Sequence, residues 1–501
     1  MIDRLRTLLA RLTPSGGVLQ RTVASGVWSV VMNASDRGLQ FLLTIVLAAM
    51  LGPRAFGLMG VALIVLSTVK RFSRLGLDEA LVQNSSENVD RYLDTTFALQ
   101  AGRGLLMAAV IAAAAPLAAR LLGDPQATQV VRVVALSPLL VGLTNPGVIY
   151  FRKDLEFHKQ FVWRVSGSVT RFLVGIGWAL VSPTVWALIA GFVAADAARL
   201  LVSYVAHDYR PGLGFERDAA GELIDFGKWI TGGSIVYFLY SEGDDLVVAW
   251  LLNSTALGFY RTAYQLANAP GTELSEVVRR VTFPAFSRIQ DDLSTLRSGF
   301  FRSLRLVTAV AFPMAFGIAA VTPTFVKAFL GSDWVPMITT MRILAGYGLL
   351  LSVTATFGPI WKARGRPDIG TKLGALRVVI LALAIVPVTN AFGIEGTAAL
   401  VTGVYLFPMF PLDTVFLVRS LETTYARFAR ELVYPLTASV AMGAVVELAR
   451  RGLTLGWLPL KFAVLVALGV VVYAGLALLL AIGTGWELEH NVREVAGVVR
   501  G

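Results

Sequence analysis

Blocks of about 20 mostly apolar residues recur along the whole chain, separated by short polar segments. A helix of about 20 residues crosses the roughly 30 Å hydrocarbon core of a bilayer and satisfies its own backbone hydrogen bonds there. Only 15% of the 501 residues are charged, whereas a typical soluble domain carries about 25%. A soluble helical protein would instead show shorter amphipathic helices with one polar face. We therefore predict an all-α integral membrane protein.

The apolar blocks also predict how often the chain crosses the membrane. Counting the blocks that are long enough predicts about fourteen transmembrane helices, several of which carry polar residues. The predicted spans are residues 24–50, 56–77, 93–118, 130–151, 161–182, 184–206, 229–252, 256–278, 303–325, 335–360, 373–390, 394–418, 432–449 and 458–483.

The distribution of basic residues predicts the orientation of these spans. With the N-terminus inside, about 31 of the 44 Lys and Arg residues fall in cytoplasmic segments or at the adjoining span ends. About six fall on the outer side, namely Arg54, Arg120, Lys327, Arg450, Arg451 and Lys461. Because cytoplasmic loops are enriched in Lys and Arg, we predict that both termini are cytoplasmic. The same distribution explains the net charge of +11 without a nucleic-acid partner.

The segments outside the spans are too short for a soluble domain. Residues 1–20 are basic and amphipathic, and we expect them to lie on the inner leaflet. They do not resemble a cleavable signal peptide, because their apolar run is short and interrupted by arginines. Residues 207–228 are typical of a cytoplasmic linker. The chain has no cysteine, which excludes disulfides and thiolate metal sites.

Two segments on either side of this linker resemble each other. An offset of 201 residues aligns Gly26 with Gly227, Trp28 with Trp229, Val46 with Val247, Ala48 with Ala249, Leu51 with Leu252, Ala55 with Ala256 and Gly57 with Gly258. Because each copy holds an even number of spans, both would insert in the same orientation, related by a pseudo-twofold axis along the membrane normal. We predict two six-helix lobes, an N-lobe at 21–206 and a C-lobe at 229–420. Residues 421–501 would add two further helices and a cytoplasmic tail.

Ordered short motifs carry a family resemblance over roughly residues 20–420. The motifs are Leu51–Pro53 with Phe56–Gly57, Leu75–Leu77 with Ala80–Gln83, Asp225–Thr231, Asp244–Leu246, Leu257–Tyr260, Phe283–Ile289, Leu330–Trp334 and Gly365–Asp368. In this order and spacing they resemble the polysaccharide exporter, O-antigen flippase-like family of the multidrug/oligosaccharidyl-lipid/polysaccharide superfamily. Beyond residue 420 the chain is similar to the family only in hydropathy.

The resemblance implies a flippase and not an enzyme. Its substrate would be a polyprenyl-(di)phosphate-linked oligosaccharide, moved across the cytoplasmic (inner) membrane by alternating access for surface polysaccharide or glycoprotein glycan assembly. The expected partners are this lipid-linked oligosaccharide, membrane lipids and polysaccharide-assembly proteins. The resemblance implies no cofactor, although a proton or sodium gradient could drive the movement.

Charged residues within the spans are the candidate substrate contacts, because burying a charge in a bilayer is costly without a functional partner. Structures of this superfamily imply that spans 1, 2, 7 and 8 line the cleft, which favours Arg37 and Arg261, with Asp36 beside the first. Arg103 is a further candidate, since a guanidinium can hold a phosphate through paired hydrogen bonds. The alternatives are pairing of Arg37 with Asp36, or arginines that extend to the membrane interface.

Acidic residues in the spans are candidates for binding a coupling ion. Asp244 and Asp245 lie in predicted span 7, where they could hold a proton or cation, or pair with an arginine. Asp196 and Arg199 are spaced for a local ion pair on one helix. Arg132 and Arg342 occupy equivalent positions of the two copies, which favours an architectural role.

Two other classes of protein remain as alternatives. A membrane-embedded enzyme acting on lipid-linked sugars would need an acid–base or metal constellation. The chain has three histidines, no H-E-x-x-H spacing and no large external loop, so we assign no catalytic and no metal-binding residue. A cation-coupled drug exporter of the same superfamily would share the fold, but such exporters usually have fewer spans and fewer intramembrane arginines.

Overall fold

The computed structural model describes residues 18–73, 89–122, 124–154, 156–212, 214 and 241–484. Within these segments the regular structure is helical, and no strand occurs. The chain divides into two compact units, Met1–Gly258 and Phe259–Gly501, which we call the N-unit and the C-unit. The predicted amphipathic segment up to residue 17, the motifs at 75–83 and 225–231, and the tail from residue 485 lie outside the described residues.

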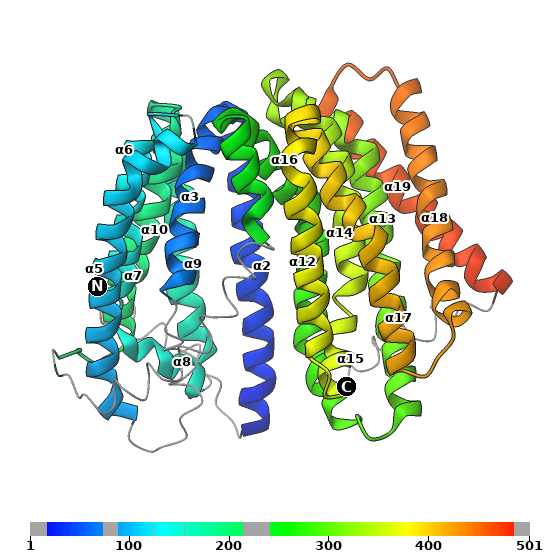
Figure 1. Ribbon diagram of the computed structural model, residues 1–501, viewed down its shortest axis with the longest axis horizontal. Helices are drawn as coiled ribbons and strands as arrows, with labels where there is room; N and C mark the ends of the chain where they lie inside the picture. Colours follow the sequence, from blue (N-terminus) through cyan, green and yellow to red (C-terminus); the bar gives the residue numbers. More distant parts are fainter. Residues whose placement is uncertain are drawn as a thin grey trace. The chain divides into compact units, whose positions relative to one another are not determined.

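Long helices and several short ones build the N-unit (Figure 1). They are α2 (Val18–Met50), α3 (Pro53–Phe72), α5 (Val89–Leu121), α6 (Ala127–Val134), α7 (Leu136–Gly142), η1 (Pro146–Ile149), α8 (Tyr150–Lys153), α9 (Phe157–Val181) and α10 (Val185–Ala206). Helix α9 packs along both α2 and α10, and α5 packs against α3, α6 and α7. The helical residues 241–251 also belong to this unit.

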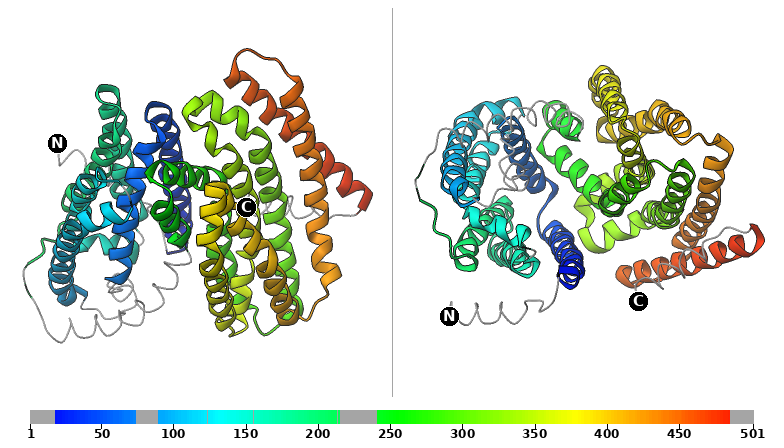
Figure 2. Two further views of the ribbon diagram at one scale, coloured as in Figure 1. Left: turned by 45° about the horizontal axis from the view of Figure 1, so that its top comes forward. Right: turned by 90° about the horizontal axis from the view of Figure 1, so that it is seen from below.

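The C-unit begins within a long helix and continues as a bundle (Figure 2). Its elements are α12 (Ser254–Arg288), α13 (Leu293–Phe325), η2 (Val326–Leu330), η3 (Ser332–Met337), α14 (Ile338–Thr354), α15 (Phe357–Ala363), α16 (Asp368–Val404), η4 (Tyr405–Met409), α17 (Phe410–Ser420), α18 (Tyr425–Gly452) and α19 (Leu458–Thr484). Helix α13 packs against α14 and α18, and α18 packs against α19.

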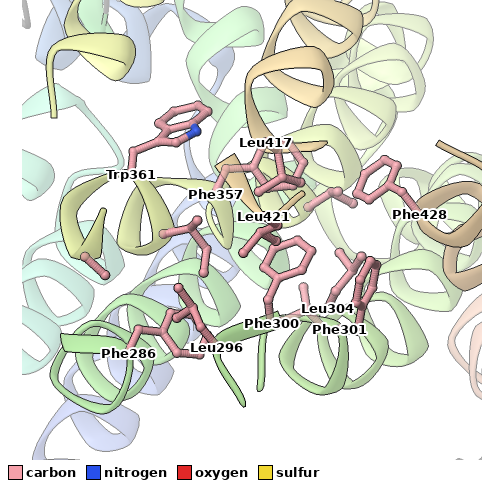
Figure 3. Close-up of a cluster of buried hydrophobic side chains, with 14 of the residues drawn as sticks. Phe286, Leu296, Phe300, Phe301, Leu304, Phe357, Trp361, Leu417, Leu421 and Phe428 are labelled. Atoms are coloured by element: carbon pink, nitrogen blue, oxygen red, sulfur yellow. The ribbon is translucent and has the colours of Figure 1, made fainter. Parts of the chain in front are cut away.

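An aromatic core holds one end of the C-unit together. Figure 3 shows Phe300 and Phe301 of α13 close to Phe357 of α15 and Phe428 of α18. The rings of Phe300 and Phe357 lie 6.2 Å apart, and those of Phe357 and Phe428 lie 5.9 Å apart. Each of these aromatic side chains buries a large apolar area in the contact between helices. These contacts therefore join three helices, α13, α15 and α18, that are not consecutive in the sequence.

Local sequence signals explain where several helices begin. Gly52 is extended and Pro53 occupies the start of α3, where its missing N–H breaks no helical hydrogen bond. Asp292 caps α13 by accepting hydrogen bonds from the backbone N–H groups of Ser294 and Thr295. The segment 279–302, which lies between two predicted spans, is mostly helical, because α12 continues to Arg288 and α13 begins at Leu293.

The chain reverses direction at Gly393, inside the segment that α16 spans. Gly393 has φ 60° and ψ −147°, a conformation that glycine adopts far more readily than other residues. The hydroxyl oxygens of Thr389 and Thr397 lie 2.8 Å apart, whereas eight residues of continuous helix would separate them by about 12 Å. The reversal falls between the predicted spans 373–390 and 394–418. It divides a 53-residue apolar segment that would be about 80 Å long as one helix.

Eight helical segments among the described residues are long and apolar enough to cross a membrane. They are Pro53–Phe72, Leu93–Leu121, Val185–Ala206, Leu293–Leu330, Ser332–Ala363, Asp368–Ser420, Tyr425–Gly452 and Leu458–Ile482. Large apolar side chains on them remain exposed, such as Leu383 and Ile482 at 77% and 76%. Contact with lipid explains this exposure. The chain is a multi-pass, all-helical membrane protein, as predicted.

Candidate functional site

Asp36 joins α2 to α9. The Ser168 hydroxyl donates a hydrogen bond to one oxygen of the Asp36 carboxylate. The Arg164 guanidinium lies 3.5 Å from the other oxygen. Asp36 is therefore paired across two helices with Arg164, and this partner lies 128 residues away along the chain.

Asp196 is the buried acid of α10, with 6% of its surface exposed. The Ser137 hydroxyl of α7 donates a hydrogen bond of 2.6 Å to it, and a guanidinium nitrogen of Arg199 lies 3.3 Å away. The predicted local pair between Asp196 and Arg199 is therefore confirmed. Gly167 of α9 leaves the room for Arg199, because a Cβ at that position would lie 2.3 Å from the Arg199 Nε.

Three further cations, Lys70, Arg103 and Arg171, belong to the same region of the N-unit. Lys70, near the end of α3, interacts electrostatically with Asp196, with Arg199 and with Arg103 of α5. Arg171 of α9 interacts with Arg199 and with both acids, and its guanidinium carbon lies 5.5 Å from the ring centre of Phe192. The side chain of Arg103 also donates a hydrogen bond of 3.3 Å to the Ser73 hydroxyl.

We call this group the N-unit cluster: Asp36, Lys70, Arg103, Arg164, Arg171, Asp196 and Arg199. It contains five cations and two carboxylates, so it carries a surplus of three positive charges at neutral pH. Each of the seven is at least partly buried by neighbouring helices. Guanidinium and ammonium groups gathered among the helices of a membrane protein can hold an anion through charge-assisted hydrogen bonds. The arrangement is therefore suited to an anionic ligand.

The structure brings two of the predicted site residues, Asp36 and Arg103, into this cluster. Arg37 lies beside Asp36 on α2 and is exposed. Arg261 lies half-buried on α12 in the C-unit, and Asp244 and Asp245 are half-buried on helical residues 241–251. These four residues do not belong to the N-unit cluster.

Arg377 is not among the site residues predicted from the sequence. On α16 this arginine is only 3% exposed. Its guanidinium donates a hydrogen bond of 3.1 Å to the Tyr347 hydroxyl, and its guanidinium carbon lies 4.5 Å from the centre of the Tyr405 ring. Two aromatic faces thus stabilise a buried cation in the C-unit. The apolar residues that follow it, Val378–Leu381, are the sequence feature that could have predicted its burial.

The start of α12 packs against the start of α3 through an unusually close contact between backbones. A Cβ on Gly57 would lie 1.5 Å from the Ser254 carbonyl oxygen, and one on Gly258 would lie 1.9 Å from that of Pro53. An offset of 201 residues converts Pro53 and Gly57 into Ser254 and Gly258. The two contacts therefore exchange under the sequence repeat. We call them the crossing contact.

Ionic and hydrogen bonds reinforce the crossing contact. Arg54 of α3 makes a two-pronged interaction with Asp124, with nitrogen–oxygen distances of 3.2 and 3.3 Å. The Ser254 hydroxyl donates a hydrogen bond of 2.7 Å to the same carboxylate. Asp124 and Ser254 are 6% and 3% exposed, respectively. The start of α12 is thus tied to both α3 and the turn after α5.

Within the described residues, no group of three or more His, Asp or Glu side chains gathers in a way that could hold a metal ion.

Residues 46–339 match the family described as polysaccharide biosynthesis protein. The chain belongs to this family. The family resemblance predicted from the sequence is therefore confirmed.

Two curated relatives and one solved structure are particularly informative. The lipopolysaccharide biosynthesis protein WzxC of Escherichia coli is 28% identical over 73% of this chain and 75% of its own length. The succinoglycan biosynthesis transport protein ExoT of Rhizobium meliloti is 27% identical over 71% and 72%. The lipid II flippase MurJ in an inward closed conformation matches 91% of this chain and 98% of its own, with a TM-score of 0.72 and 13% identity. At this identity MurJ shows the shared fold alone.

Proposed function

We propose that this chain is a flippase that moves a polyprenyl-(di)phosphate-linked oligosaccharide across the cytoplasmic membrane. Its product would serve surface polysaccharide or glycoprotein glycan assembly. The observation that carries the proposal is the N-unit cluster, whose five cations and two acids lie among helices of a membrane protein. Membership of the polysaccharide biosynthesis family and the names of WzxC and ExoT support the same substrate class.

The chemistry of the substrate explains why such a cluster is needed. A sugar headgroup carries hydroxyls that each cost a few kcal/mol when placed unpaired in hydrocarbon, and a diphosphate adds charge. In the proposed mechanism, Lys70, Arg103 and Arg171 bind the diphosphate, and arginine donates paired hydrogen bonds to its oxygens. Asp196 and Asp36 hold Arg199 and Arg164 in place. The lipid tail stays in the bilayer.

We further propose the architecture predicted from the sequence, with about fourteen spans, two six-helix lobes and cytoplasmic termini. The eight membrane-length segments, the reversal at Gly393 and the exchange of the crossing contact under the repeat all support it. Alternating access would require the crossing contact to close one face of the membrane and separate when that face opens. The lobe limits, with a linker at 207–228, remain part of this proposal.

Residues outside the cluster receive secondary roles in this mechanism. Arg37 and Arg261 would contact the substrate as it enters or leaves, as the family resemblance implies. Asp244 and Asp245 would bind a coupling proton or sodium ion. Polysaccharide-assembly proteins would receive the product on the outer side.

Reconstitution of the purified chain tests the proposed function. Vesicles containing fluorescent lipid-linked oligosaccharide should show transfer to the opposite leaflet, measured by loss of fluorescence to a membrane-impermeant quencher. Arg103→Gln and Arg171→Gln should each slow transfer about tenfold or more. A hydrogen bond to a charged group contributes roughly 1.5–3 kcal/mol, and about 1.4 kcal/mol corresponds to a factor of ten.

The matched control is Arg366→Gln, which removes an exposed arginine whose partner is Asp368. It should transfer substrate at the rate of the unmodified chain. If labelled substrate stays on its starting side under every ion gradient, the flippase proposal is wrong. Hydrolysis or extension of the sugar by the purified chain would favour the enzyme alternative, and export of organic cations would favour the drug exporter.

A further inference from the structure

A second group of arginines lies at the end of α18, far from the N-unit cluster in the sequence. Glu447 accepts hydrogen bonds from Arg450, at 2.6 and 2.9 Å, and from Arg451, at 2.9 Å. Arg342 of α14 approaches the same carboxylate at 3.8 Å. We call these four residues the Glu447 cluster. Three cations thus share one anion.

The arginines of the Glu447 cluster offer many more hydrogen-bond donors than Glu447 can accept. A carboxylate offers about four acceptor positions, whereas three guanidinium groups offer about fifteen donors. Within the described residues, Glu447 is the one hydrogen-bond or ion-pair partner of all three arginines. The side chains of Arg342 and Arg451 are 42% and 71% exposed. The cluster therefore presents a net charge of two and many free donors to an oxygen-rich anion.

The surroundings of the cluster indicate the depth of lipid headgroups. Trp457, in the turn between α18 and α19, is 67% exposed, as are Leu448 at 69% and Leu460 at 44%. Tryptophan is enriched where the hydrocarbon meets the headgroups, and exposed leucines are suited to acyl chains. Lys461 donates a hydrogen bond of 2.7 Å to the Leu453 carbonyl and so places a further cation beside this turn.

Topology alone does not account for these cations. Arg450, Arg451 and Lys461 are among the few basic residues on the predicted outer side, where membrane proteins carry fewer of them. An ion pair that only joined α14 to α18 would need one arginine for Glu447 and not three. The surplus leaves two positive charges available to an anion at the membrane surface.

We propose that the Glu447 cluster binds the phosphate group of an anionic phospholipid in the outer leaflet. The phosphate would accept hydrogen bonds from Arg342 and Arg451, while Arg450 stays paired with Glu447. The acyl chains would lie along the exposed leucines of α18 and α19. This site belongs to the C-unit, and it does not depend on the flippase mechanism.

Binding of defined lipids to the full-length purified chain tests this site. The probes are phosphatidylglycerol and phosphatidylcholine, added separately to detergent-solubilised protein, with bound lipid counted by native mass spectrometry. The double variant Arg342→Gln/Arg451→Gln should bind phosphatidylglycerol about 30-fold more weakly, because each basic residue near a membrane surface contributes roughly one factor of five to lipid affinity. Binding of phosphatidylcholine should not change. Arg450 remains in this variant, so Glu447 keeps a partner.

The matched control is Arg366→Gln/Lys372→Gln, which also removes two cations that share one carboxylate, that of Asp368. The control should bind phosphatidylglycerol as the unmodified chain does. Equal loss in both double variants, or no loss in either, would overturn the proposal. Binding of inorganic phosphate as tight as that of phosphatidylglycerol would also overturn it. The site would then recognise a free anion and not a lipid.

Discussion

At the scale of single residues, two buried acidic side chains show how charge is balanced in this protein. Asp124 and Asp196 are each buried and satisfied by one arginine and one serine, although they lie in different parts of the N-unit. The same chemistry thus serves two purposes. One acid fixes the start of α12, and the other holds Arg199 within a surplus of cations.

Two histidines make the stability of the chain depend on pH. Burial lowers the pKa of His158 and of His207 below the ordinary value of about 6.5. The ring nitrogens of His158 have no hydrogen-bond partner within the described residues, and Nδ1 of His207 accepts a hydrogen bond from the Tyr209 N–H. The folded state therefore favours neutral rings, so the unfolded chain takes up protons first as the pH falls. The melting temperature should decrease from about pH 7 to pH 5.

Substitution of these histidines provides the control for this prediction. The double variant His158→Gln/His207→Gln should show a smaller decrease of the melting temperature over the same pH range, whatever its stability at pH 7. An equally steep decrease in the double variant would show that other groups cause it.

Pairs of elements are held together by contacts between residues that are distant in the sequence. α13 and α18 are joined by the buried pair of Arg305 and Glu431, at 2.9 Å, as well as by the aromatic core. α3 and α12 approach closely enough at the crossing contact that neither glycine leaves room for a side chain.

The crossing contact predicts a specific effect of one methyl group. Gly258→Ala should separate α12 from α3, because its Cβ would lie 1.9 Å from the Pro53 carbonyl oxygen. Since the chain has no cysteine, Ser254→Cys provides a single reporter that is buried while the contact is intact. A membrane-impermeant maleimide should label Ser254→Cys at least several-fold faster when Gly258→Ala is also present.

Gly177→Ala is the matched control, because a Cβ at that exposed helical glycine meets nothing within 4 Å. It should leave the labelling of Ser254→Cys unchanged and stabilise α9 slightly. Equal labelling rates with Gly258→Ala and Gly177→Ala would contradict the interpretation of the contact as a tight closure.

At the scale of the whole molecule, the predicted topology specifies on which side of the membrane each loop lies. Ser298, near the start of α13, is exposed and predicted to be cytoplasmic, whereas Thr454, in the turn after α18, is exposed and predicted to be external. In intact cells an impermeant maleimide should label Thr454→Cys and not Ser298→Cys, and disruption of the membrane should make both reactive. Labelling of both in intact cells would refute the proposed orientation.

The part of the fold and of the candidate site that the sequence predicts is the part that depends on interactions between residues close together in the chain. Apolar helices and the pair of Asp196 and Arg199 depend on neighbours within a few residues, so hydropathy and spacing predict them. The bond between Asp196 and Ser137, and the pairing of Asp36 with Arg164, depend on which helices pack together, and no local pattern encodes that. Arg377 follows Lys372 by five residues, yet its burial depends on Tyr347 and Tyr405, which come from other elements.

The exchange of the crossing contact under the internal repeat has a consequence for the symmetry of the chain. A contact in which each of two equivalent glycines touches the other copy's carbonyl is the kind that a twofold homodimer makes at its axis. Under the proposed two-lobe architecture, the contact therefore has the symmetry expected of an interface between two equivalent half-length subunits.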